Sequence, residues 1–145
     1  MIFLEKPEQF VPKFEVVSCF IEHNTKILLL HRQDHKPQGG TWGVPAGKIE
    51  EGEDERGALV REIKEELGLV IERDTPDFVS KVYVKFEQYD FPYHMFRLKF
   101  LEKPLITVNF KDHKRYAWVS PKEALDMNLI QDEDACIKLV YFQGK

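Results

Sequence analysis

The sequence predicts an α/β fold, an α/β/α sandwich built on a mixed β-sheet, and three patterns carry this prediction. Two apolar runs rich in Val, Leu, Ile and Phe occupy residues 14–22 and 26–31. A proline-free segment dominated by Ala, Leu, Glu, Lys and Arg follows at 53–67, and alternating apolar residues return at 77–88 and 94–102. Strands on both sides of a helical segment, with further helical patterns near the C-terminus, place helices on both faces of one sheet.

The first two apolar runs predict an antiparallel pair of strands. His23 and Asn24 separate the runs and provide a turn. Residues 32–46 contain several glycines and prolines, so they are expected to form a loop. The composition of 53–67 then favours a helix, and Gly68 supplies its C-terminal stop.

The second half of the chain predicts two further strands and then a short one. The strands at 77–88 and 94–102 are expected to join through a turn around 90–92, and a short strand follows at 116–119. Ser120 is a suitable N-cap, with a proline after it at the first helical position. Two helices are expected to close the chain, at about 121–127 and 132–140.

Length and composition limit the function classes. With 145 residues and 43% apolar residues, a single domain spanning 1–145 is expected to enclose one core. The net charge of −4 and the lack of a basic run argue against duplex nucleic acid or an anionic membrane as a partner. Cys19 and Cys136 have no metal-ligand spacing, so both are expected to be reduced thiols. The N-terminus lacks a long apolar run, so no signal peptide or membrane span is expected and the location is expected to be cytoplasmic.

The predicted helix at 53–67 carries a cluster of acidic side chains. At about 100° per residue, Glu62, Glu65 and Glu66 fall on one arc beside the apolar stripe, so their carboxylates are expected to converge. Converging carboxylates raise each other's pKa unless a cation neutralises them. Mg²⁺, with Mn²⁺ as a substitute, is the natural partner for such oxygen ligands. The alternative is a solvated acidic helix face.

The spacing around this helix is more specific than its charge. A glycine is followed after five residues by a glutamate, and after seven more by Arg-Glu-apolar-any-Glu-Glu-any-Gly-apolar. The matching positions are Gly47, Glu53, Arg61, Glu62, Ile63, Glu65, Glu66, Gly68 and Leu69. At average residue frequencies, the chance of this match at one given position is on the order of 10⁻¹⁰. The pattern resembles, without a mismatch, the signature box of the Nudix hydrolases, in particular MutT-like members.

The resemblance implies a reaction, a cofactor and a local fold. The implied reaction is hydrolysis of a nucleoside diphosphate linked to another group, with Mg²⁺ polarising the pyrophosphate and activating a water. The implied metal ligands are the carboxylates of Glu62, Glu65 and Glu66 and the backbone carbonyl of Gly47. Glu53 could bind a further ion or hold Arg61 in a salt bridge, and Arg61 could instead contact the substrate. The box is expected to fold as loop, helix, loop on the sandwich.

The general base has two candidates. In this family the base is a box glutamate or an acidic residue in a later loop, and Asp112 stands where several relatives carry a glutamate. Aspartate is shorter, so a solvated loop acid is the alternative. His113 beside it could titrate near neutrality.

Three residues outside the box are candidates for substrate binding. Arg32 could reach a substrate phosphate or be a surface arginine. Trp42 could stack on a base or serve in packing. Asp132 stands where relatives that clean the nucleotide pool read the base edge, and the alternative is a plain helix N-cap. Aromatic residues also crowd the predicted hairpin, and one of them could stack on a nucleobase: Phe86, Tyr89, Phe91, Tyr93 and Phe96.

Narrower family patterns that would name the substrate are missing from the sequence. The leading expectation is a nucleoside triphosphate, intact or damaged, cleaved to a monophosphate and pyrophosphate. The alternatives are a nucleotide-sugar hydrolase and a non-catalytic module that senses a nucleotide. The apolar arm at 1–11 could pair across a homodimer.

Overall fold

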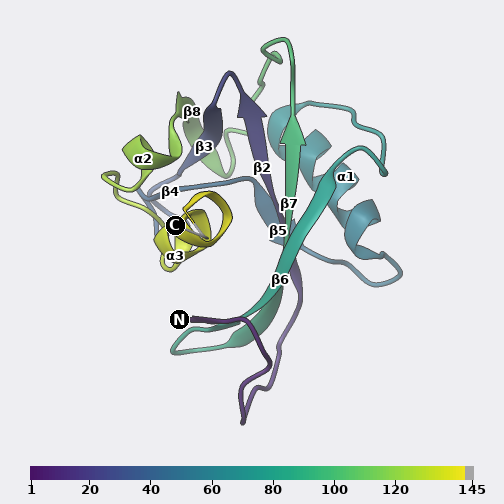
Figure 1. The fold of residues 1–145 in the computed structure, drawn as a ribbon, viewed down its shortest axis with the longest axis vertical. Helices are drawn as coiled ribbons and strands as arrows, with labels where there is room; N and C mark the ends of the chain where they lie inside the picture. Colours follow the sequence, from purple (N-terminus) through teal and green to yellow (C-terminus); the bar gives the residue numbers. More distant parts are fainter. Residues whose placement is uncertain (143–145) are drawn as a thin grey trace.

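The computed structural model describes residues 1–142 as a mixed β-sheet with helices on both faces, as the sequence predicts (Figure 1). Its strands are β1 (Ile2–Phe3), β2 (Val16–His23), β3 (Lys26–Arg32), β4 (Trp42–Gly43), β5 (Ala46–Lys48), β6 (Asp77–Lys85), β7 (Asp90–Lys99) and β8 (His113–Val119). Its helices are α1 (Glu55–Leu67), α2 (Pro121–Ala124) and α3 (Glu133–Tyr141). The main strand order is β1-β6-β7-β2-β3-β4, while β5 pairs with β2 and β8 pairs with β3.

β2 and β7 form the centre of the sheet. They run parallel, from Val16 opposite Tyr93 to Glu22 opposite Lys99. The pairs β2–β3, β6–β7 and β3–β8 are antiparallel, so the sheet is mixed. A parallel pair needs a long crossover connection, and the chain between β2 and β7 includes α1.

The two faces of β2 belong to two separate cores. Successive side chains of a strand point to opposite faces. Val17, Cys19 and Ile21 pack in one core with the apolar side of α1, while Val16 and Phe20 pack in the other with α3. Figure 1 accordingly shows α1 on one side of the sheet and α2 and α3 on the other. Burial on both faces explains why this strand reads as a continuous apolar run.

Both ends of α1 are capped by the residues beside it. The Asp54 side chain accepts a hydrogen bond from the Gly57 N–H at 2.8 Å, which starts the helix two residues later than predicted. At the other end Gly68 has a φ of 72° and donates its N–H to the Lys64 carbonyl. A left-handed residue at this position is why glycine suits the stop.

The predicted hairpin turn at 90–92 is wrong. The chain turns at 86–89, where the Phe86 N–H donates to the Tyr89 carbonyl at 3.0 Å. Phe91 is buried in the core, and its ring lies edge-on to that of Phe86 at 5.3 Å. This aromatic packing holds the predicted turn residues in an extended strand.

Three smaller boundaries also differ from expectation. β8 begins at His113, three residues earlier than predicted. α2 ends at Ala124, because the Met127 N–H bonds back only three residues to the Ala124 carbonyl and the α-helix does not continue. The expected loop at 32–46 contains the short strands β4 and β5.

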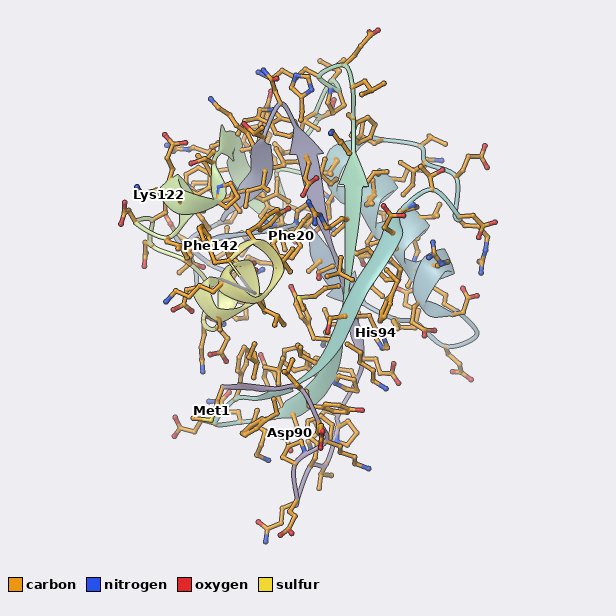
Figure 2. The ribbon with its side chains drawn as sticks, viewed as in Figure 1. Met1, Phe20, Asp90, His94, Lys122 and Phe142 are labelled. Atoms are coloured by element: carbon orange, nitrogen blue, oxygen red, sulfur yellow. The ribbon has the colours of Figure 1, made fainter. Side chains whose placement is uncertain are left out.

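The N-terminal arm at 1–11 pairs with its own sheet. Ile2 lies opposite Val84 in the β1–β6 ladder, and Met1 and Asp90 lie at the same end of the molecule (Figure 2). The homodimer proposed for this arm stays a prediction. No helix within residues 1–142 is long and apolar enough to cross a membrane.

We expect Ile63→Ala to destabilise the protein by about 2–5 kcal/mol, because the side chain is fully buried between α1 and the sheet and its loss leaves a cavity. Ile63→Val should cost only about 0.5–1.5 kcal/mol. Urea unfolding measures both values. Lys64→Ala, on the exposed side of the same helix, is the control. Equal losses for the alanine variants at 63 and 64 would contradict this packing.

Candidate active site

Arg61 organises the acidic face of α1. Its Nε and Nη2 donate to the Glu53 carboxylate at 2.7 and 2.9 Å. Its Nη1 donates to Glu62 at 2.9 Å and to Glu65 at 3.1 Å. Nη2 also donates to the Lys48 carbonyl at 2.9 Å. The salt bridge expected between Glu53 and Arg61 is therefore present, and it ties the loop before α1 to the helix.

These bonds shift the ionisation of the residues around Arg61. The hydrogen bonds from Arg61 lower the pKa of Glu53 to about 2. Burial raises the pKa of Glu62, although Arg61 opposes the shift. Glu62 packs directly on the backbone of β5, so that a Cβ at Gly47 would overlap its carboxylate. Glycine at 47 is therefore required by close approach.

Glu66 is the buried carboxylate of the helix, with 8% of its surface exposed. Its Oε1 accepts a hydrogen bond from the Ala46 N–H at 3.1 Å. Burial, followed by the negative charge of Glu62, raises its pKa well above the usual range for a glutamate. A cation placed beside this side chain would oppose both causes.

The sequence predicts that the carboxylates of Glu62, Glu65 and Glu66 converge on one point, and this prediction is wrong for the structure as it stands. Within residues 1–142, no three Asp, Glu, His or Cys side chains are arranged as a metal site. The reason is that Arg61 draws Glu62 and Glu65 to itself, while Glu66 turns to the Ala46 N–H. The donor set still fits a hard divalent cation, because it consists of carboxylate oxygens and includes the buried Glu66, whose Oε1 accepts from a neutral backbone N–H.

A cavity of about 530 Å³ opens beside Glu66, and its lining has two chemical characters. One group is polar or charged and includes Arg32, Lys36, Glu66 and His113. The other is aromatic and comprises Phe14, Phe86, Tyr89, Phe91 and Tyr93. The aromatic residues predicted at the hairpin are thus brought to the cavity, with the exception of Phe96, which packs in the core under α1.

The two loop candidates beside β8 differ in exposure. Asp112 is one-third exposed and forms an ion pair with Lys36 at 2.7 Å, which lowers its pKa. His113 is buried, and burial together with Arg32 lowers its pKa to about 4. The expectation that His113 titrates near neutrality is therefore wrong.

Arg32 and Trp42 have different surroundings. Arg32 lines the cavity, and its Nε donates to the Pro37 carbonyl at 2.8 Å. Trp42 stacks on His31, with ring centroids 4.3 Å apart, and packs against the core. Trp42 is not among the described residues that line the cavity, which favours packing over base stacking.

Asp132 stands at the start of α3 but does not cap it. Its φ is 69°, and within the described chain its side chain makes no capping hydrogen bond. The carboxylate lines the cavity and pairs with the N-terminal ammonium of Met1. The alternative of a plain N-cap is therefore wrong.

Glu133 is a cavity residue that the sequence did not reveal. It is 4% exposed, and its Oε1 accepts a hydrogen bond from the Val44 N–H at 3.0 Å. Its Oε2 is buried without a hydrogen-bond partner among residues 1–142. Burial raises the pKa of this carboxyl to about 7. An acid in the first turn of a helix usually indicates an exposed residue, so no local signal marked it.

We expect Glu133→Gln to change how stability depends on pH. The pKa of this carboxyl is about 7 in the folded state and 4.5 in the unfolded state, so the folded state keeps the proton up to a higher pH. Wild-type stability should then fall by about 3 kcal/mol from this group as pH rises from about 4.5 to 7, and level off above that. The glutamine variant should lack this loss. Urea unfolding at several pH values measures it, with exposed Asp134→Asn as control. A constant difference between variant and wild type would contradict the burial argument.

Comparisons with known proteins support the family that the signature box indicates. The model of the NUDIX domain matches residues 12–140. The chain is 36% identical over 117 residues to the CTP pyrophosphohydrolase of Escherichia coli (strain K12), covering 79% of this chain and 82% of that protein. It is 30% identical over 142 residues to an RNA pyrophosphohydrolase of Campylobacter jejuni subsp. jejuni, covering 90% of this chain and 89% of that protein.

Solved structures share the fold. The solution structure of the E. coli ORF135 protein has a TM-score of 0.71 and 30% identity, covering 89% of this chain and 88% of that chain. A MutT Nudix hydrolase from Burkholderia pseudomallei superposes with a TM-score of 0.75 at 23% identity, over 88% of this chain and 97% of that chain. The chain therefore belongs to the Nudix family and is a hydrolase of phosphoanhydride bonds.

Proposed function

We propose that the protein is a divalent-metal-dependent pyrophosphohydrolase that cleaves a nucleoside triphosphate to a monophosphate and pyrophosphate. One observation carries the proposal: a single cavity joins aromatic rings, which can hold a base, to cations and a buried carboxylate, which can meet phosphates. The similarity to a CTP pyrophosphohydrolase over most of both chains supports the same substrate class.

The polar part of the cavity would hold the triphosphate. Glu62, Glu65 and Glu66, with the Gly47 carbonyl, would hold Mg²⁺, and Mn²⁺ could replace it. The bound ion would supply charge neutralisation and polarisation of the phosphoanhydride. Arg32 lines the cavity, and its guanidinium could donate to phosphate oxygens.

The buried carboxyl of Glu133 gives the base part of the cavity a preference. Below a pH of about 7 this group is protonated, so it can donate one hydrogen bond and accept another. The Watson–Crick edges of cytosine, adenine, uracil and guanine each present a donor beside an acceptor, so the protonated carboxyl complements all four. Above that pH the ionised carboxylate only accepts hydrogen bonds, which favours guanine, the base with two adjacent donors on this edge. Below it we assign the first preference to CTP, because the chain is similar to a CTP pyrophosphohydrolase over most of both chains.

A substrate panel tests this function. We expect Mg²⁺-dependent release of monophosphate and pyrophosphate, resolved by chromatography, with the highest kcat/KM for CTP below a pH of about 7. The CTP-to-GTP ratio should fall as pH rises through about 7 in the wild type, because ionised Glu133 only accepts hydrogen bonds and guanine offers two adjacent donors. Glu133→Gln, which keeps a donor at all pH values, should show a ratio that is independent of pH.

Other outcomes of the panel would assign the alternatives. Faster cleavage of ADP-ribose or another nucleotide sugar would overturn the triphosphate assignment. Faster cleavage of 5′-triphosphorylated RNA would do the same. Nucleotide binding by calorimetry without turnover of any substrate would indicate a sensing module.

Removal of charge at Glu66 tests the metal site. Glu66→Gln keeps the bond to the Ala46 N–H but removes the buried charge, so we expect a loss of at least about 10²-fold in kcat. The melting temperature of the wild type should rise with Mg²⁺ or Mn²⁺ and that of the variant should not. Glu55→Gln, exposed on the same helix, is the control. Turnover that survives excess chelator, or a variant with normal activity, would place the chemistry elsewhere.

A further inference from the structure

The ion pair between Lys36 and Asp112 stands at the edge of the cavity. The Lys36 Nζ and the Asp112 Oδ1 lie 2.7 Å apart, and both side chains are 33% exposed. Lys36 lines the cavity, whereas Asp112 lies in the loop just before β8. Asp112 is still close enough to Glu66 for its charge to raise the pKa of that buried carboxyl.

The two loops that carry this pair are joined by other bonds. The Gln33 N–H donates to the Asp112 carbonyl at 2.9 Å. The Gln33 side chain donates to the Phe110 carbonyl at 2.8 Å, and a second ion pair joins Lys114 to Asp34 at 2.7 Å. The loops would therefore stay together if Lys36 left Asp112.

An exchange of partners by Lys36 would cost little. A partly exposed ion pair between flexible side chains contributes little to stability. A phosphate in the cavity offers the ammonium a charge-assisted hydrogen bond and a higher negative charge than a single carboxylate. Lys36 already lines the cavity, so a change of its side-chain rotamer can provide the movement.

We propose that substrate phosphates take Lys36 away from Asp112, and that Asp112 thereby becomes the group that accepts the proton of the attacking water. This inference rests on the proposed function. The water oxygen forms a new bond to phosphorus while the bridging P–O bond breaks, and its electron pair leaves with the pyrophosphate. The water proton passes to the Asp112 carboxylate and then to solvent.

The charges around Asp112 explain why the exchange matters. Lys36 is the largest cause of its lowered pKa, followed in effect by the nearby His113 and Lys111. A carboxylate stabilised in this way is a weaker base. His113 is neutral at physiological pH and Glu66 is an acid, so among these neighbours within residues 1–142 Lys111 would still favour the ionised form after Lys36 has moved. The base is thus kept weak until a nucleotide is bound.

Steady-state kinetics of Lys36→Met against pH, with CTP and saturating Mg²⁺, test the exchange. The matched control is Lys114→Met, which breaks the neighbouring ion pair of the same two loops. For Lys36→Met we expect a KM about 10-fold higher, because one phosphate contact is lost. The acid limb of kcat/KM, which reports the free enzyme, should move to higher pH. The acid limb of kcat should not move, because in the wild-type complex Lys36 has already left Asp112. The control should change neither.

Two results would overturn the exchange while leaving the proposed function intact. One is a kcat profile that moves together with the kcat/KM profile, which would mean that Lys36 stays on Asp112 in the complex. The other is normal turnover by Asp112→Asn, which would return the proton to a different acceptor. Lack of turnover by the wild type with every nucleotide would overturn the proposed function and the exchange together.

Discussion

The hydrogen bonds of one guanidinium hold the acidic motif together. Arg61 satisfies carboxylates at 53, 62 and 65 and a backbone carbonyl at 48, so it links the loop before α1 to the middle of that helix. Without a cation at this place, the carboxylates of the loop and the helix would repel one another. Arginine suits the position better than lysine because its planar fork offers several donors in fixed directions. The glycine at 47 completes the arrangement by letting Glu62 approach the strand backbone.

Two buried carboxyls line the cavity, and they come from helices on opposite faces of the sheet. Glu66 comes from α1 and Glu133 from α3, and burial raises the pKa of each. A buried acid of this kind costs stability whenever it ionises, and two of them beside one cavity are therefore candidates for functional groups. The two carboxyls have different surroundings, because Glu66 lies among the candidate metal ligands whereas Glu133 lines the same cavity as the aromatic rings.

The sequence predicts most reliably what is set by local spacing. The α1 helix, its glycine stop and the Glu53–Arg61 bridge follow from residues close together in the chain, and each is present. The features that the sequence missed or misplaced depend on contacts between residues far apart in the chain. Glu133 accepts a hydrogen bond from the N–H of Val44, 89 positions away, and Asp132 pairs with the N-terminal ammonium of Met1. The hairpin turn was misplaced because the burial of Phe91 depends on its aromatic neighbours in the folded sheet.

This division between local and distant contacts explains why one box can accompany different substrates. The proposed metal ligands lie on α1 and β5, where the spacing is fixed by the helix and by the close approach at Gly47. The end of the cavity proposed to hold the base is built from Phe14, the β6–β7 hairpin and the start of α3, none of which belongs to the box. Side chains there can change without disturbing Arg61 and its carboxylates. Family membership can therefore be read from the box, whereas the proposed base preference would follow from the shape and protonation of the other end of the cavity.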